Sequence, residues 1–522
     1  MKKVLALLLA AAMAFSMVAC GGNGGSSAAA GGNGGSGAAA GGDGPRTSMV
    51  YGMSAEPSTL DPMNIASMNT FTVTYALYDT LTAPDGNGSY VPYLCDDVKV
   101  SEDGLTYTIL LNKEVKFQDG TTLTTEDIAF SIQRTIAAGW AADMARYIES
   151  VEAVDENTVV MTLNAPFNGM MGSLASPFFS IMSKAYCEEQ GDEGLKRAPM
   201  GTGAYKLAEW VSGDHITLEA NEDYFAGAPA IKTITLRPIT DKNTGMIALE
   251  AGEIDAFLNV NPSDIPLIEA NPDLKLYTCD AASVLSLNMN VEDEILSNEK
   301  VRQAIFAAIN KDDIIAGALE GLGTAANSPV PTVCAGYSAS TPGSVYDPEQ
   351  AKTLLKEAGY ENGLSLTLCL KEDNTNQKVA QIIKSQLAEV GIDVTIDIME
   401  GGAWTDKVYT KGEYQLTVGA WFSMFLDAYS VMYSQFHKDC YGGTGNITHV
   451  TTDELSNLLD AAAAASDAEK VAAYDAVCAN ILEHAYQLPL VYQQTTITTS
   501  ADLKGVEPSP LGVYMFKDFY FE

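Results

Sequence analysis

A strand–helix–strand pattern between residues 364 and 398 constrains the fold more than any other feature of the sequence. Residues 364–370 form a short apolar run typical of a buried strand, and residues 377–390 repeat apolar side chains at helical spacing up to Gly391. Residues 392–398 then alternate apolar and polar side chains, as a strand does. Two strands joined through a helix are expected to be parallel, with a right-handed crossover. The sequence therefore predicts an α/β fold, in which ligands bind beyond the carboxyl ends of the strands.

Length and charge limit the number of domains and the kind of partner. The chain has 522 residues, which is more than one hydrophobic core usually serves, so we expect two or three domains. Asp and Glu number 67 against 30 Lys and Arg, a formal net charge of −37. This balance argues against a nucleic acid as partner and against broad attachment to anionic lipid. We interpret the acidity as a solvated surface.

The N-terminus has the pattern of a targeting segment. Lys2 and Lys3 precede an almost wholly apolar stretch, residues 4–19, which ends in small residues before Cys20 and Gly21. This order is typical of a bacterial lipoprotein signal, in which the cysteine is lipidated and becomes the mature N-terminus. We predict a signal peptide over residues 1–19 and lipidation of Cys20. A plain secretory signal is the alternative.

Residues 20–44 are predicted to be the lipidated cysteine and a flexible tether. They are almost entirely Gly, Ala, Ser and Asn, a composition that cannot build a core. Such a chain has a typical reach of roughly 25–30 Å. No later stretch contains 18 consecutive apolar residues, so no transmembrane helix is expected after the signal.

Further elements can be predicted from periodicity and turn residues. Strands are expected at 105–111, 158–163, 205–210, 215–220 and 488–492, with a strand ending at Trp421. Helices are expected at 75–82, from Thr124 onward, at 244–250, 298–310, from Pro348 to Gly359, and through most of 453–486. Residues 166–183 are rich in Met and Phe, which favours core over an adaptable surface.

Residues 199–257 carry a distinctive series of short motifs. A glycine-paired turn, GTGAY, leads into a strand that ends at Trp210, then a hairpin, the loop NEDYFAGAP and the run ALEAGEID. This order resembles the solute-binding proteins of peptide- and nickel-type ABC importers, although Ala204 stands where the family usually has proline. The segments EPSTLDP (56–62), DGLTYTILLNKEVKFQDG (103–120) and VRQAIFAAINKDDI (301–314) extend the resemblance over nearly everything from Met49 to Glu522.

The resemblance implies a two-lobed, periplasmic-binding-protein-like α/β fold of type II, in the large peptide-binder class, with an extra subdomain in the first lobe. Residues 45–284 plus 490–522 would form lobe I with its inserted subdomain, and residues 285–489 would form lobe II. The change of lobe is expected within residues 283–290.

The resemblance also implies a ligand site between the lobes. One wall would come from the segment after the first strand, and the other contacts from strand ends and the two cleft tryptophans. Carried over by position, the ligand-binding residues are Glu56, Pro57, Ser58, Ser67, Asn69, Thr70, Tyr205, Asn288, Lys371, Trp404, Trp421 and Asp427.

Two positions of this set depart from the family's peptide binders. Met424 stands where those proteins have an Asp for the peptide's amino group, so a free peptide N-terminus is in doubt unless Asp427 takes over. Lys371 lies near the place of an Arg for the ligand carboxylate, and would act there as a point charge. A solvated Lys371 is the alternative.

The sequence contains no set of catalytic or metal-binding residues at a known spacing. We find no G-x-S-x-G, H-E-x-x-H or P-loop motif, and the four histidines are far apart. We therefore expect no catalytic residue, no metal and no cofactor. The seven cysteines after Cys20 form no C-x-x-C pair, and we interpret most of them as small buried residues.

The expected function follows from the resemblance. It implies a monomeric, lipid-anchored receptor on the outer face of the bacterial cytoplasmic membrane, which captures a small solute, by default a peptide, and delivers it to an ABC permease. A non-peptide solute (an amino-acid derivative, a sugar or a metal complex), a sensor for a receptor kinase, and a secreted hydrolase or adhesin on the same scaffold stay open.

Overall fold

The computed structural model describes residues 45–64, 67–85, 89–139, 141–442 and 445–522, which belong to one compact unit, Pro45–Glu522. The expected signal peptide, Cys20 and the tether lie outside the described residues. Within the described ranges, no helix has the length and apolar character that a membrane span needs.

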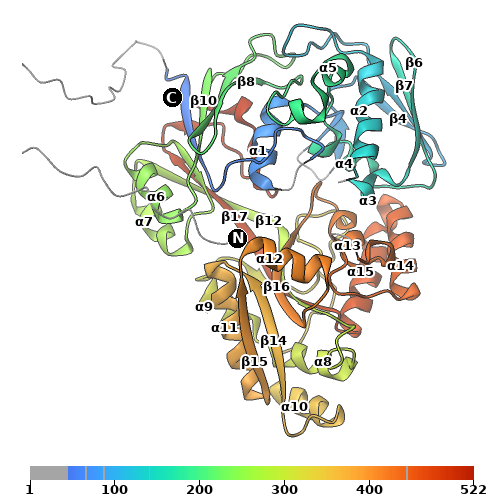
Figure 1. Cartoon of the computed structure of the whole chain (residues 1–522), viewed down its shortest axis with the longest axis vertical. Helices are drawn as coiled ribbons and strands as arrows, with labels where there is room; N and C mark the ends of the chain where they lie inside the picture. The colour runs from blue at the N-terminus through green and yellow to red at the C-terminus, as the bar shows by residue number, and fades with distance from the viewer. Residues whose placement is uncertain (1–44, 65–66, 86–88, 140, 443–444) are drawn as a thin grey trace, which may run out of the picture. The chain divides into compact units, whose positions relative to one another are not determined.

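A mixed sheet of eleven strands forms the framework (Figure 1). Its order is β15-β14-β16-β12-β17-β11-β1-β10-β9-β8, with β13 paired to β17. The bounds are β1 Ser48–Met53, β8 Tyr205–Val211, β9 His215–Ala220, β10 Thr233–Pro238, β11 Ala256–Leu258, β12 Leu274–Met289, β13 Thr324–Ala325, β14 Leu364–Lys371, β15 Ile392–Met399, β16 Leu416–Phe422 and β17 Gln487–Ser500.

Two long strands connect the two ends of this sheet. β12 pairs antiparallel with β17 along most of its length, and its second half also pairs with β16. β17 pairs in turn with β11, which leads to the N-terminal strand β1. Residues 283–289 of the segment in which the change of lobe is expected lie in β12, and the lobe boundaries stay a prediction.

The predicted strand–helix–strand unit is confirmed. β14 and β15 are parallel along their full length, and α11 (Asn374–Glu389) connects them. The helices α8 (Glu299–Ala308), α9 (Lys311–Ala318) and α10 (Pro348–Glu357) pack with α11 around an apolar core on this part of the sheet.

A separate antiparallel sheet agrees with the expected extra subdomain. Its order is β4-β5-β7-β6, with bounds β4 Asp97–Val100, β5 Thr106–Leu110, β6 Ile148–Asp155 and β7 Thr158–Leu163. Helix α2 (Thr125–Ala138) packs against it and begins next to Thr124, as the sequence indicated. Thr124 and Asp127 form a capping box there.

The remaining elements correct one expectation and confirm another. The helix expected at 75–82 is α1, Met68–Leu77, which begins earlier because Ser67 caps it. The helical region 453–486 is two helices, α14 Asp453–Ala464 and α15 Asp467–Glu483, separated by Ala465 and Ser466. The other α-helices and the short strand pairs complete the fold. The helices are α3 Ala142–Ala145, α4 Met170–Ser173, α5 Lys184–Leu195, α6 Lys242–Glu250, α7 Ile265–Ala270, α12 Gly401–Thr405 and α13 Ala428–Phe436. The strand pairs are β2 Thr82–Pro84 with β3 Tyr90–Pro92, and β18 Leu503–Lys504 with β19 Tyr520–Phe521.

The glycine-paired turn is explained by a close backbone contact. A side chain at Gly203 would lie 2.5 Å from the carbonyl oxygen of Ala76, so only glycine fits. Next to this turn, the buried Asp79 accepts hydrogen bonds from Thr202 and Tyr224, each 2.8 Å long. Burial raises the pKa of Asp79 to about 6, although these hydrogen bonds oppose the shift.

Helix α13 docks onto the subdomain through aromatic rings. Phe167 lies 4.5 Å from Tyr429, ring centre to ring centre, and stacks on Tyr147 at 4.4 Å. The Tyr429 hydroxyl donates to the carbonyl of Asp143 at 2.6 Å, and Arg146 pairs with the Asp439 carboxylate. Segments far apart in sequence therefore share one core here.

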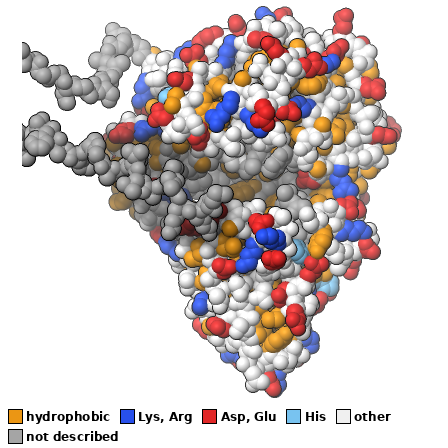
Figure 2. Space-filling view, viewed as in Figure 1, with side chains coloured by type: hydrophobic (Ala, Val, Ile, Leu, Met, Phe, Trp, Pro, Cys, Tyr) orange, Lys and Arg blue, Asp and Glu red, His pale blue; other side chains and the backbone are white. Residues whose placement is uncertain are grey.

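The surface and the cysteines agree with the sequence interpretation. Figure 2 shows acidic and basic side chains interspersed on the visible face. Among the described residues no disulfide is formed: five of the seven cysteines are buried, and Cys279 and Cys440 are partly buried.

Candidate functional site

A small cavity lies where β12, β16 and β17 meet helix α13 and the segment after β15. Three of the residues predicted from sequence, Asn288, Trp404 and Trp421, line it together. The full lining is Val284, Ser286, Asn288, Pro329, Trp404, Tyr409, Gly419, Ala420, Trp421, Gln435, Ile447 and Gln487. Its volume is about 30 Å³, which is about the share of one water molecule in the liquid.

The floor of the cavity is a patch of sheet. Ser286 and Asn288 lie on the same face of β12, because successive side chains of a strand point to opposite sides and residues two apart therefore share a face. Ser286 is paired with Gly419 of β16, and Asn288 with Gln487 of β17. A side chain at Gly419 would meet nothing within 4 Å, so this glycine leaves the floor open.

Three aromatic side chains form a wall. The ring of Tyr409 lies 5.5 Å from that of Trp404 and 6.4 Å from that of Trp421. The indole Nε1 of Trp404 donates to the Thr417 hydroxyl at 3.1 Å, which fixes the ring. Burial raises the pKa of Tyr409 to about 12, so its hydroxyl stays neutral at physiological pH.

Three of the polar side chains that line the cavity are amides, and only Asn288 among them was predicted from the sequence. The side-chain Nε2 of Gln487 donates to Asn288 Oδ1 at 2.7 Å and to Gln435 Oε1 at 2.9 Å. All three residues are buried. The available signal was a polar amide within a largely apolar segment, since Gln435 lies in the run AYSVMYSQF and Gln487 precedes LPLVY.

Asp427 has structural partners in this fold. It is buried and caps α13 through the backbone amide of Tyr429 at 2.8 Å. Its other oxygen accepts from the Lys470 ammonium at 2.7 Å, and Lys470 is equally buried. Met424 packs partly buried against the neighbouring core. These contacts favour a structural role for Asp427, and its contact with a ligand stays a prediction.

The predicted wall after β1 lies in another part of the fold. Glu56 accepts hydrogen bonds from the Trp210 indole at 2.6 Å and from the backbone amide of Gly213 at 2.8 Å. Its carboxylate is therefore bound to the β8–β9 hairpin. Pro57 is buried and Ser58 is exposed. None of these three is among the residues that line the cavity.

The last predicted residues are divided between helix caps, core and surface. The hydroxyl of Ser67 caps α1 and contacts that of Thr70 at 3.2 Å, and Asn69 accepts from Ser54. Tyr205 is fully buried, and its hydroxyl donates to backbone carbonyls of Ile231 and Phe516. Lys371 is exposed at the end of β14. That any of these five residues contacts a ligand also stays a prediction.

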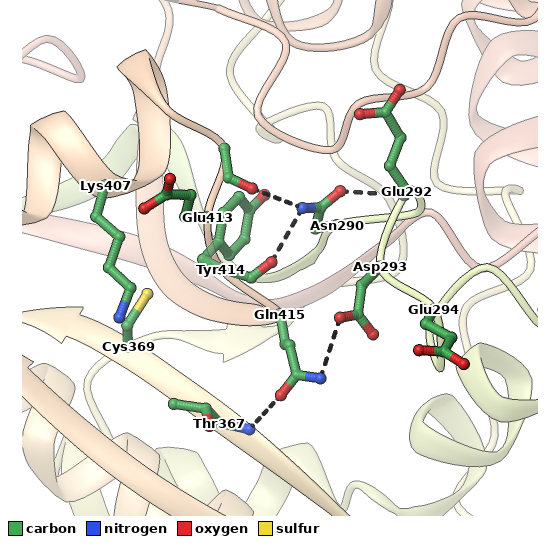
Figure 3. A pocket seen from close by; sticks show the side chains of 11 residues that line it. Asn290, Glu292, Asp293, Glu294, Thr367, Cys369, Lys407, Glu413, Tyr414 and Gln415 are labelled. Carbon is green, nitrogen blue, oxygen red and sulfur yellow. Dashed lines mark hydrogen bonds between the residues drawn. The ribbon is translucent and has the colours of Figure 1, made fainter.

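A second, larger cavity of about 630 Å³ opens at the start of β16 (Figure 3). There the Gln415 side chain accepts from the Thr367 backbone amide at 2.8 Å and donates to Asp293 at 3.1 Å, which closes the sheet where β14 and β16 diverge. Glu292, Glu294 and Glu413 line it but are exposed. Among the described residues, no group of three or more His, Cys, Asp or Glu is placed to hold a metal ion.

Comparison with known proteins gives consistent results. Residues 89–443 match the family model described as bacterial extracellular solute-binding proteins, family 5. The chain is 31% identical over 483 residues to the glutathione-binding protein GsiB of Escherichia coli K12, covering 90% of this chain and 94% of that protein.

Solved structures agree with this likeness. The periplasmic binding protein DppA from Helicobacter pylori, in complex with the peptide STSA, superposes with a TM-score of 0.83 and 27% identity over 92% of this chain and 98% of that one. AgaA of A. tumefaciens, in complex with agropinic acid, superposes with a TM-score of 0.80 and 29% identity over 91% and 99%. The two-lobed α/β fold expected from the sequence is thereby confirmed.

Proposed function

Because this chain belongs to the bacterial extracellular solute-binding proteins of family 5, we propose that it is the lipid-anchored receptor of an ABC importer for small peptides or peptide-like solutes. In this proposal Cys20 holds the protein on the outer face of the cytoplasmic membrane, and the segment up to residue 44 is the tether. The receptor closes around one solute molecule and delivers it to the permease.

The observation that carries the proposal is the cavity lined by Asn288, Trp404 and Trp421. Each of these residues was expected at the ligand from a different part of the sequence, and the fold brings them together. Aromatic walls with a few fixed polar groups are the usual lining of a solute site. Among the described residues that line it, no nucleophile–base pair is present.

The ligand class is argued from the relatives. GsiB is named for glutathione, DppA was solved with a tetrapeptide and AgaA with agropinic acid. A small peptide or a compound derived from an amino acid is common to these ligands. A cavity of about 30 Å³ admits only the tip of such a ligand, and every lining residue except Val284 belongs to the predicted lobe II. In this proposal the rest of the ligand is held by lobe I when the two lobes close.

A thermal-shift screen tests the proposal. The mature chain with Cys20→Ser, which cannot be lipidated, is heated with di- and tripeptides, glutathione, amino acids, sugars and nickel complexes. A ligand at 100 times its Kd adds about 2.7 kcal/mol of stability, which is readily detected. A shift with sugars alone, or with none of these, would contradict the proposed ligand class.

Two variants connect any shift to the cavity. Trp421→Ala should weaken binding at least ten-fold without unfolding the protein, and Gly419→Val should fill the open floor. The matched control is Phe422→Ala, because Phe422 follows on the same strand with its side chain on the opposite face and 44% exposed. If Trp421→Ala and Gly419→Val bind the ligand as tightly as the control Phe422→Ala does, the ligand binds outside this cavity.

A further inference from the structure

The described residues that line the cavity present uncharged groups to a ligand. They comprise a serine, three amides, aromatic rings and aliphatic groups, and none of them is acidic or basic. A charge that enters such a cavity loses its hydration and finds no opposite charge, which is costly. An aromatic face can stabilise an ammonium ion, but by less than the hydration that is lost.

The negative charge of Asp427, which follows β16 along the chain, is already paired with a positive charge of the protein. One oxygen of Asp427 accepts from Lys470 at 2.7 Å, and the other accepts from the Tyr429 backbone amide. Both members of the ion pair are buried. If Asp427 turned to a ligand's ammonium group, Lys470 would be left buried without a partner, so this exchange is unfavourable.

Two atoms of the buried amides complement an amide of the ligand. Asn288 accepts through Oδ1 and Gln487 donates through Nε2, so within the described part of the chain Asn288 Nδ2 and Gln487 Oε1 have no hydrogen-bond partner. The same holds for the Ser286 and Tyr409 hydroxyls and the Trp421 indole N–H of this lining. Of the two amide atoms, one is a donor and the other an acceptor. A secondary amide offers the opposite pair, a carbonyl and an N–H, on a flat group that fits against an indole ring.

We propose that the end of the solute held in this cavity is an uncharged amide, so that the receptor prefers peptides whose N-terminus is acylated or otherwise blocked over the same peptides with a free amine. This inference rests on the proposed function, because it specifies the ligand of the same site.

One pair of peptide pools tests it. A pool of synthetic di- and tripeptides is divided, and one half is N-acetylated. Each half is titrated into the mature Cys20→Ser chain, and melting temperature and calorimetric Kd are measured at pH 7. We expect the acetylated pool to bind at least ten-fold more tightly. Tighter binding of the free pool overturns the inference and leaves the proposed function intact. Binding of neither pool overturns both.

A charge-introducing variant gives a second test at the same site. Asn288→Asp retains the oxygen that accepts from Gln487 and replaces the unpartnered Nδ2 by a carboxylate oxygen. This variant should shift the preference at least ten-fold toward free amines. Because Asn288 is buried, circular dichroism first shows that the variant is folded. If it does not fold, Gln435→Glu, which places a carboxylate in the same lining, is titrated instead. An unchanged preference in a folded variant would contradict the inference.

Discussion

The ion pair between Asp427 and Lys470 should be one of the most sensitive polar contacts in the protein. The carboxylate and the ammonium lie 2.7 Å apart, and their side chains are 6% and 8% exposed. The pair holds the loop after β16 to helix α15, next to the proposed site. We predict that Lys470→Met lowers the free energy of unfolding by about 3–5 kcal/mol.

The magnitude follows from two opposing terms. At 2.7 Å and an effective dielectric constant of about 20, the attraction between two unit charges is about 6 kcal/mol. Burying the two ions costs several kcal/mol each, so the pair as a whole adds little net stability. Removing only Lys470 abolishes the attraction and leaves the cost of the buried carboxylate. The single variant is therefore expected to lose far more than the pair contributes.

A double-mutant cycle measured by urea unfolding at pH 7 tests this reasoning. The double variant Asp427→Asn, Lys470→Met keeps an oxygen for the Tyr429 amide and should lie within about 1 kcal/mol of the wild type. The matched control is Lys300→Met, because Lys300 and Glu357 are also 2.7 Å apart but about half exposed, and an exposed pair is worth about 0–1 kcal/mol. Equal losses from the Lys470 and Lys300 variants, or a double variant as unstable as the sum of its parts, would refute the argument.

Three further predictions concern other parts of the chain. Because burial raises the pKa of Asp79 to about 6, the folded state binds a proton more tightly than the unfolded state, so Asp79 lowers stability as pH rises from 4 to 6. Asp79→Asn should flatten this slope in urea unfolding measured from pH 4 to pH 7, although Asp143, whose pKa burial also raises to about 6, keeps part of it. Tyr429→Phe should cost about 1 kcal/mol and speed hydrogen exchange in α13, because it removes the hydrogen bond to the Asp143 carbonyl; unchanged exchange would contradict the contact. Cys20→Ser should move the protein from the membrane fraction to the medium or periplasm, and continued membrane retention would count against the lipid anchor.

The fold was largely predictable from the sequence, because its elements show clear local patterns. Alternation placed β7 and β9 at their observed bounds, and the strand–helix–strand unit has the predicted parallel pairing. The error at α1 has a local cause as well. The segment 68–77 mixes buried threonines with apolar residues, so it lacks a helical stripe, and its cap, Ser67, was predicted as a ligand-binding residue instead.

The site was only partly predictable, because pairing between distant side chains leaves no local signal. The two tryptophans and Asn288 were found through a resemblance, whereas Gln435 and Gln487 were not, since each lies in an apolar segment that periodicity assigns to the core. The same limit affects Asp427. In the sequence it is an acid without a neighbouring base, because Lys470 follows 43 residues later on another helix.

The ion pair therefore changes the meaning of the sequence around Met424. From the sequence, a missing acid at this position and a present one at Asp427 suggest that one carboxylate has replaced the other. In the fold, Asp427 is neutralised by Lys470, and Met424 contributes only apolar surface, so this loop offers a ligand no free negative charge. A receptor built this way recognises a solute through shape, aromatic contact and amide hydrogen bonds. Its selectivity should accordingly depend weakly on ionic strength, since screening acts on charges and hardly on neutral hydrogen bonds.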